Sequence, residues 1–352
     1  MTGSPTAMAR EIAEIPAVAA RQVSLGLADY RAIGARLRRL APAVIVTCAR
    51  GSSDNASVYL KYLVETRIGI PVAAIGPSVA SVYDARLSLD RAVCVTISQS
   101  GGSPDLVSLQ DHARAGGAAA LALLNTPDSP VGSAADEVVP VMAGPETAVA
   151  ATKSLVASLV AIAGIVAGWT EDDDLARGLE ALPESLAASL ACRWEHALPA
   201  VADANSLYVI GRGPGYAIAR EAALKLKETC RLHAEAYSAA EVRHGPIAIA
   251  RSRPRDRFVA LMFHARDASR ASLEQACAAM RGIGAPVFVA DSEGRGESAL
   301  PESALPVAAA AHPLLDPICQ ITSFYRFVEA LSAELGEDPD RPEHLRKVTE
   351  TL

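Results

Sequence analysis

Ala43-Val-Ile-Val-Thr-Cys-Ala49, which leads directly into Arg50-Gly51-Ser52-Ser53, decides the fold because its pattern returns later in the chain. The second copy reads Ser206-Leu-Tyr-Val-Ile-Gly211-Arg212-Gly213-Pro214-Gly215, at an offset of roughly 160 residues. In each copy an apolar run of strand length precedes a Gly-containing turn and a helix rich in Ala, Leu and Lys. Continuous apolar strands are typical of parallel sheets covered by helices on both faces. We therefore predict an α/β protein built from two copies of one unit.

Further strand-like segments, separated by helical stretches, follow each copy. They are residues 70–75, 92–97, 121–124 and 137–141 in the first half, and 258–263 and 286–290 in the second. The chain has 352 residues, of which 50% are hydrophobic and only 4% aromatic. That length exceeds what one core usually holds, so we expect two domains. The predicted segments are an N-terminal helical segment 1–40, a first domain with connector helices 41–190, a second domain 191–335 and a C-terminal active-site tail 336–352.

Composition excludes several classes of function. A net charge of -7 gives no basic surface for nucleic acid or for an anionic membrane. Six cysteines without a C-x-x-C pair indicate neither a zinc site nor a disulfide framework. The N-terminus lacks the pattern of a signal peptide, and the apolar run 155–169 is short for a membrane span and is expected to be a buried helix. We expect a cytoplasmic protein.

The first half carries Ser98-Gln99-Ser100-Gly101-Gly102-Ser103-Pro104 directly after a predicted strand. Ser103 is a suitable N-cap and Pro104 a suitable first helical residue, so hydroxyls and backbone N–H groups converge on a helix N-terminus. Such a loop suits a phosphate monoester. The same composition also forms an ordinary strand-to-helix turn. The chain has no Walker-type phosphate loop, which argues against a nucleotide site.

The second half concentrates acid–base residues. Glu221, Lys225 and Glu228 share one face of a predicted helix, because residues three and four apart are neighbours on a helix surface. His233 and the segment Glu241-Val-Arg-His244-Gly-Pro246 follow closely. This density indicates a catalytic site. A solvated helix face with ion pairs, and a turn histidine at position 244, remain the alternatives.

Taken together and in order, these motifs resemble the sugar isomerase (SIS) family. The similarity is closest to the isomerase half of the glutamine:fructose-6-phosphate aminotransferases and to the stand-alone SIS-type glucosamine-6-phosphate deaminases. The motifs are Ser98–Ser103, Ala143–Lys153, Glu221–Glu228, His233–Tyr237, Arg243–Pro246 and the tail Pro342–Thr349.

The resemblance implies two tandem SIS domains, each a parallel five-stranded sheet flanked by helices, in a homodimer with a shared active site. It implies that Glu228 moves a proton between C2 and C1, beside Lys225. It also implies that His244 opens the sugar ring in the site of the neighbouring subunit, and that Lys347 closes over the open-chain sugar. The implied substrate-binding residues are Gly51, Ser52, Ser53, Ser98, Gln99, Ser100, Ser103 and Val149.

Departures from the aminotransferase pattern favour deamination. Met1-Thr2 offers no N-terminal cysteine nucleophile, Arg50 replaces the usual Cys, and Gly102 replaces the usual Glu. The expected reaction converts glucosamine 6-phosphate to fructose 6-phosphate and ammonia, and it is expected to need no metal or cofactor. An aldose/ketose isomerase, a fructosamine-6-phosphate deglycase and a non-catalytic sugar-phosphate sensor remain alternatives. Arg50 is expected to face either the phosphate or an acidic residue, and the sequence leaves that choice open.

Overall fold

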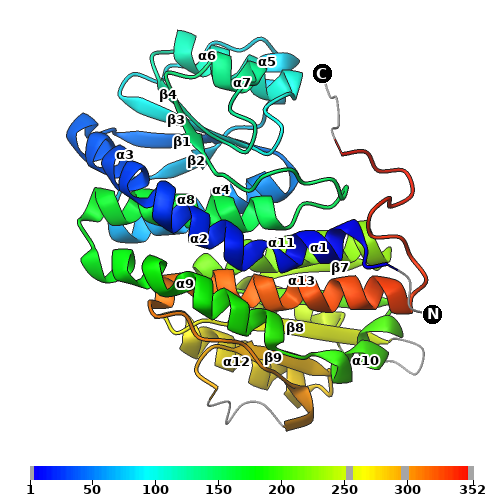
Figure 1. Ribbon diagram of the computed structural model, residues 1–352. Helices are drawn as coiled ribbons and strands as arrows, with labels where there is room; N and C mark the ends of the chain where they lie inside the picture. The colour runs from blue at the N-terminus through cyan, green and yellow to red at the C-terminus, as the bar shows by residue number, and fades with distance from the viewer. Residues whose placement is uncertain (1–3, 251–256, 295–300, 348–352) are drawn as a thin grey trace. The chain divides into compact units, whose positions relative to one another are not determined.

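The computed structural model describes residues 4–250, 257–294 and 301–347. The chain divides into two compact units. Figure 1 shows the elements, coloured by residue number along the chain. The N-terminal unit comprises Ala17–Glu146, Lys153–Glu180 and Arg346–Leu352, and the C-terminal unit comprises Met1–Pro16, Thr147–Thr152 and Ala181–Leu345. The first helix groups with the C-terminal unit, because Asp340 caps it by accepting hydrogen bonds from Ala7 N and Met8 N at 2.6 and 2.8 Å.

The N-terminal unit contains a five-stranded, wholly parallel sheet in the order β2-β1-β3-β4-β5. The strands are β1 (Val44–Cys48), β2 (Val72–Ala74), β3 (Ala92–Ser98), β4 (Ala119–Leu124) and β5 (Glu137–Pro140). Its helices are α2 (Ile15–Leu25), α3 (Leu27–Leu40), α4 (Gly51–Arg67), α5 (Ser78–Ser81), α6 (Pro104–Ala115), α7 (Pro130–Ser133) and α8 (Lys153–Thr170). In Figure 1, α6 lies on one face of the sheet and α4 and α8 lie on the other. The central strand β3 is buried along its whole length, as the apolar run predicted.

The C-terminal unit repeats this topology. Its sheet has the order β10-β9-β8-β6-β7, also wholly parallel. Read from its other edge, the order becomes β7-β6-β8-β9-β10, which matches β2-β1-β3-β4-β5 strand for strand. The prediction of two copies of one α/β unit is confirmed.

The elements of the C-terminal unit include two strands that the apolar pattern did not reveal, β7 and β10. The strands are β6 (Ser206–Gly211), β7 (Ala234–Ser238), β8 (Phe258–His264), β9 (Val287–Asp291) and β10 (Ala304–Leu305). The helices are α1 (Ala7–Ala13), α9 (Asp173–Ala191), α10 (Leu198–Ala202), α11 (Pro214–Cys230), α12 (Arg270–Gly282) and α13 (Asp316–Glu334). The 3-10 turns are η1 (Glu195–Ala197), η2 (Glu241–His244), η3 (Pro246–Ala248), η4 (Pro301–Ser303) and η5 (Pro313–Leu315). Helices α2 and α9 have residues in both units.

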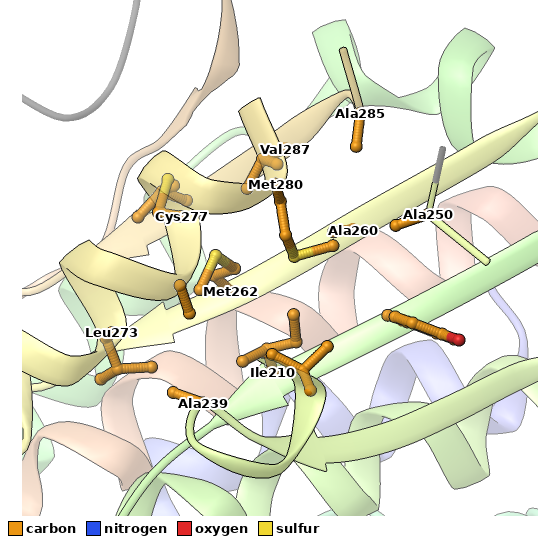
Figure 2. Packing of buried hydrophobic residues seen from close by; sticks show 14 of the residues in the cluster. Ile210, Ala239, Ala250, Ala260, Met262, Leu273, Cys277, Met280, Ala285 and Val287 are labelled. Atoms are coloured by element: carbon orange, nitrogen blue, oxygen red, sulfur yellow. The ribbon is translucent and has the colours of Figure 1, made fainter. Parts of the chain in front are cut away.

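One core of the C-terminal unit lies between its sheet and α12. It contains Ala239 and Ala250, the two ends of the loop that carries His244. Figure 2 shows Ile210, Ala260 and Met262 of the sheet beside Met280 of α12, with Ala239 and Ala250 in the same cluster. Most of the cluster consists of alanine, aliphatic and sulfur-containing side chains, and Tyr208 and Phe258 contribute aromatic rings.

Among the described residues, α8 is long and apolar enough to cross a membrane by length and composition. Its mean hydropathy is 1.6, but 94% of this stretch is buried inside the protein. The predicted buried helix at residues 155–169 is therefore confirmed. The six cysteines are all unpaired, and five of them are buried.

Candidate active site

The serine-rich loop of the N-terminal unit connects β3 to α6 at the carboxyl edge of the sheet. Gly101 N donates to Ser98 Oγ at 3.0 Å, and Gly102 N donates to Ser100 Oγ at 3.3 Å. Ser103 is the N-cap of α6 and Pro104 its first residue, as predicted, but the Ser103 side chain makes no capping bond. The hydroxyls and the helix N-terminus are therefore arranged for an external acceptor such as a phosphate.

Gly101 is required by the shape of this loop. Its φ is +62°, and a Cβ at this position would lie 2.1 Å from Ser129 Oγ. Val131 N donates to the Gly101 carbonyl at 3.0 Å. The segment around Ser129 therefore holds the loop from behind, a support that the sequence did not predict.

A second predicted binding segment, Gly51 to Ser53, lies at the same sheet edge. It forms the first turn of α4, directly after β1, and β1 pairs with β3 in a register that sets Cys48 opposite Thr96. Gly51 has a φ of +54° and is exposed, while Ser52 and Ser53 are half-buried. The structure therefore brings this turn and the serine-rich loop to neighbouring strand ends.

Arg50 contacts an acidic residue, which answers the question that the sequence left open. Its Nε and Nη2 donate to Asp105 Oδ2 at 2.9 and 2.6 Å. Asp105 lies in the first turn of α6 and its side chain is 1% exposed, whereas that of Arg50 is 53% exposed. Arg50 thus neutralises a buried carboxylate beside the serine-rich loop.

Asn125, at the end of β4, is a residue that the sequence analysis missed. Its backbone N–H donates to the Ser98 carbonyl at 3.4 Å, and its side-chain amide bonds to Gly144 O at 2.9 Å and to Ala143 N at 2.8 Å. It thereby links the serine-rich loop to the Ala143–Lys153 motif. The sequence did contain one signal for Asn125, namely a polar residue directly after a buried strand.

Lys347 is held by a buried carboxylate of the same unit. Its Nζ lies 3.2 Å from Glu146 Oε2. Glu146 also accepts hydrogen bonds from Ser154 N at 3.1 Å and Ser154 Oγ at 2.6 Å. The tail lysine is 25% exposed, so it is a docked residue here. Val348 and Thr349 of the predicted tail motif lie outside the described residues.

Val149, the remaining predicted binding residue, belongs to the C-terminal unit. Its N–H donates to the Asp340 carbonyl at 3.2 Å, and its side chain is half-buried. The same Asp340 caps α1, so one residue of the tail holds both segments.

The polar stripe on α11 is buried, which excludes the alternative of a solvated helix face. Lys225 is 1% exposed and donates to the carboxylate of Glu228, which is 24% exposed. On its other side Lys225 lies 3.4 Å from Glu221, which is fully buried and accepts a hydrogen bond from Tyr325 Oη at 3.1 Å. Glu228 is thus the member of the stripe that reaches solvent.

The charge of Lys225 is set by these two carboxylates. Burial by itself lowers the pKa of Lys225, but the charges of Glu221 and Glu228 outweigh it, so the pKa lies above its usual value. Lys225 therefore remains a cation beside the Glu228 carboxylate. Such an arrangement can support a proton-transferring carboxylate while stabilising nearby negative charge.

A cavity of about 130 Å³ in the C-terminal unit includes Glu228 in its wall. The other residues that line it are Lys227, Thr229, Arg231, Glu337, Asp338, Pro342, Glu343 and Leu345. Arg231 lies within 3.6 Å of Glu337 and 3.5 Å of Glu343, so the tail is tied to the end of α11.

His244 lies in the same unit, at the end of the turn η2, and is exposed. His233 is also exposed and lies directly before β7. This position does not suggest a chemical role. Within the described residues, no group of three or more His, Cys, Asp or Glu side chains could hold a metal ion.

Comparison with known proteins agrees with this geometry. The sequence profile named "SIS domain" matches residues 42–167 and 200–323. Glutamine–fructose-6-phosphate aminotransferase (isomerizing) of Zymomonas mobilis is 31% identical to this chain over 367 aligned positions. That alignment covers 97% of this chain and 58% of the relative, so the chain spans less than two thirds of the relative's length.

Two solved structures are informative. A protein of Silicibacter pomeroyi named "putative phosphosugar isomerase" matches with a TM-score of 0.88 and 45% identity, over 96% of this chain and 100% of that one. Glucosamine-6-phosphate deaminase of Thermotoga maritima matches with a TM-score of 0.78 over 98% and 100% of the two chains. Its identity is 16%, so it shows a shared fold only.

Proposed function

The chain belongs to the SIS domain family, and from that premise we propose that it is an enzyme that isomerises a phosphorylated sugar. The observation that carries this proposal is the Glu228 carboxylate, which reaches solvent while a buried lysine holds it. A sensor of sugar phosphates needs a binding loop but no proton-transferring group. Here the serine-rich loop is accompanied by Glu228, Lys225, His244 and Lys347.

More specifically, we propose an amino sugar phosphate deaminase that acts on glucosamine 6-phosphate. His244 opens the pyranose ring, and Glu228 removes the C2 proton to give an enolamine. Return of the proton to C1 gives the C2 ketimine, and water then releases ammonia and fructose 6-phosphate. These steps need no external oxidant or reductant, because the C1 aldehyde is reduced as C2 of the same molecule is oxidised.

Substrate binding in this proposal relies on hydroxyl and backbone N–H groups. Ser98, Gln99, Ser100 and Ser103 bind the phosphate, and Gly51 to Ser53, with Val149, bind the sugar. Lys347 leaves Glu146 to contact the oxygens of the open-chain sugar. The proposal includes a homodimer in which His244 serves the neighbouring subunit's site.

An aldose/ketose isomerase is the second candidate, and the 45% identical structure from Silicibacter pomeroyi favours it by its name. Its substrate carries a hydroxyl in place of the amine at C2, so the same proton transfer gives a ketone directly and releases no ammonia. A fructosamine-6-phosphate deglycase would use nearly the same residues.

The decisive experiment measures ammonia release from glucosamine 6-phosphate by the purified full chain and by Glu228→Gln. We expect kcat to fall by roughly 10²- to 10⁴-fold in the variant, since a general base is lost while the shape is kept. Glu274→Gln, which neutralises a carboxylate with a 42% exposed side chain on α12, is the matched control and should be fully active.

Each other outcome identifies an alternative. Conversion of a sugar phosphate without ammonia release would favour the aldose/ketose isomerase. Tight binding of sugar phosphates without turnover would favour the sensor and refute the enzyme.

A further inference from the structure

The segment that carries His244 is a surface loop with buried ends. Ala239 and Ala250 are both fully buried in the core between the sheet and α12, and Figure 2 labels them there. Between them, His244 and Gly245 are exposed, while Val242 is fully buried. The position of the imidazole therefore depends on how the middle of the loop is fixed to the core.

The middle of the loop contains a sharp corner at Gly245-Pro246. Gly245 has φ +146° and ψ −54°, a conformation that residues with a side chain rarely adopt. The turn η2 ends directly before this corner, and η3 begins at Pro246 itself. Any rotation of the corner changes the direction of the His244 side chain, because His244 is the adjacent residue.

Tyr208 of β6 ties this corner to the sheet. Its Oη donates to the Pro246 carbonyl at 2.9 Å. The ring is 2% exposed and is held edge-on by Tyr237 and Phe258, with centroid distances of 4.8 and 4.9 Å. Burial raises the pKa of Tyr208, so the hydroxyl remains a protonated donor.

We propose that Tyr208 is a positioning residue for His244, acting through the Pro246 carbonyl. The assignment rests on the proposed role of His244 in ring opening. Tyr208 itself is buried in the core and acts by fixing the Gly245-Pro246 corner, so that the imidazole of His244 meets the ring oxygen of the sugar in one orientation. Loss of a single hydroxyl, with the aromatic packing intact, should therefore slow catalysis.

The test variant is Tyr208→Phe, and the chain offers a matched control. Tyr30 in the N-terminal unit is 1% exposed, and its Oη donates to the Pro140 carbonyl at 2.7 Å. Tyr30→Phe therefore removes the same kind of bond, from a tyrosine to a proline carbonyl, in the unit that does not contain His244. Both variants should lose similar thermal stability.

The first readout is hydrogen exchange of residues 241–250, which needs no substrate. We expect Tyr208→Phe to speed exchange of the Ala248, Ile249 and Ala250 amides, which bond to the carbonyls of residues 245, 246 and 247 at 3.0 to 3.1 Å. Tyr30→Phe should leave this segment unchanged. Unchanged exchange in Tyr208→Phe would overturn the proposal whatever the protein's reaction is.

The second readout is turnover of glucosamine 6-phosphate. We expect kcat to fall about tenfold in Tyr208→Phe, since small misplacement of a catalytic group is costly, with KM little changed. In a His244→Ala background the same substitution should have no further effect, because the residue through which it acts is gone. An equal loss in both backgrounds would mean a general structural role. If wild-type protein turns over no sugar phosphate, the proposed function fails, and the exchange measurement alone decides whether Tyr208 fixes the corner.

Discussion

The loops that follow the central strands of the two sheets have the same length and different chemistry. β3 ends at Ser98 and α6 begins at Pro104, whereas β8 ends at His264 and α12 begins at Arg270. Five residues separate strand and helix in each case. The duplicated fold therefore delivers a loop of one size to the same place in each unit, and the comparison isolates the effect of its side chains.

In the first loop, the N-cap Ser103 makes no side-chain capping bond, and no carboxylate lies between Ser98 and Ser103. In the second loop, Asp267 Oδ1 accepts hydrogen bonds from Ser269 N at 2.7 Å and from Ser269 Oγ at 2.5 Å. Its negative charge at the helix N-terminus stands where an anionic ligand would otherwise bind.

Arg266 of the second loop is also internally satisfied. It donates from Nε and Nη2 to the two oxygens of Asp316, at 2.8 and 2.7 Å, and Asp316 is fully buried. The second loop is thus closed by its own ion pairs, while the first presents donors outward. The difference teaches that topology places the loop, and that the satisfaction of its polar groups decides whether it can bind a ligand.

The largest expected effect concerns His264, which ends β8 as Ser98 ends β3. His264 is fully buried, and within the described residues neither ring nitrogen has a hydrogen-bond partner. Burial lowers the pKa of His264 from 6.5 to about 4, against the opposing charge of Asp291. The unfolded chain binds a proton at higher pH than the folded one, so stability falls as pH drops from about 6.5 to 4.

We expect His264 to cost the C-terminal unit about 3 kcal/mol of unfolding free energy between pH 7 and pH 4. His264→Leu should remove this component of the pH dependence. The measurement is urea denaturation at both pH values, with unfolding monitored by the fluorescence of Trp194. The ring centroids of Trp194 and Phe263 are 6.5 Å apart. All proteins would carry Trp169→Phe, so that Trp194 is the only tryptophan.

The exposed His233 provides the control for this experiment. His233→Gln should leave the pH dependence of wild type unchanged, since its imidazole is accessible to water in both states. An identical loss of stability in wild type and His264→Leu would show that buried carboxylates, and not His264, dominate the acid sensitivity.

The fold could be predicted largely from apolar runs, and the exceptions have a physical cause. β6, β8 and β9 are buried inside the second sheet, and their sequences are continuous apolar segments. β7 and β10 are its edges. β7 is only partly buried and contains Glu235, and β10 has two residues, so neither leaves a clear apolar pattern.

The candidate site was predictable where its residues are close in sequence. The stripe on α11 follows from helical spacing, and the N-cap at Ser103 follows from local preference. The contact of Lys347 with Glu146 joins residues 201 positions apart, and Arg50 meets Asp105 across 55 positions. Such long-range pairs leave no local pattern, so they emerge only when the chain is folded.

The next largest effect should be on KM, when the first loop is given a negative charge like that of Asp267 in the second. Ser103→Asp places a carboxylate at the N-terminus of α6, in the manner of Asp267 before α12. We expect KM for a sugar phosphate to rise by roughly 30-fold or more, because like charges meet at short range in a partly buried site. Steady-state kinetics at low ionic strength would measure it.

Ser103→Asn separates charge from shape in this comparison. Asn has nearly the shape of Asp and is an equally good N-cap, so it should change KM only a few-fold and leave stability intact. A similar rise in KM for Asn and Asp would mean that the Ser103 hydroxyl itself, and not the absence of negative charge, makes the first loop a binding loop.

The smallest effect tests a feature that occurs next to both loops, an arginine paired with a buried aspartate in the first turn of a helix. Arg50 pairs with Asp105 as Arg266 pairs with Asp316. Arg50→Ala should lower the unfolding free energy by about 1 to 2 kcal/mol, less than for a fully buried pair, because Arg50 is half exposed and water replaces part of its interaction. Arg114→Ala, which breaks a pair with the 46% exposed Asp136, should cost less than about 0.5 kcal/mol. If thermal and urea denaturation showed the same loss of unfolding free energy for Arg50→Ala and Arg114→Ala, the burial of Asp105 would not matter. The serine-rich loop would then need no neutralised carboxylate behind it.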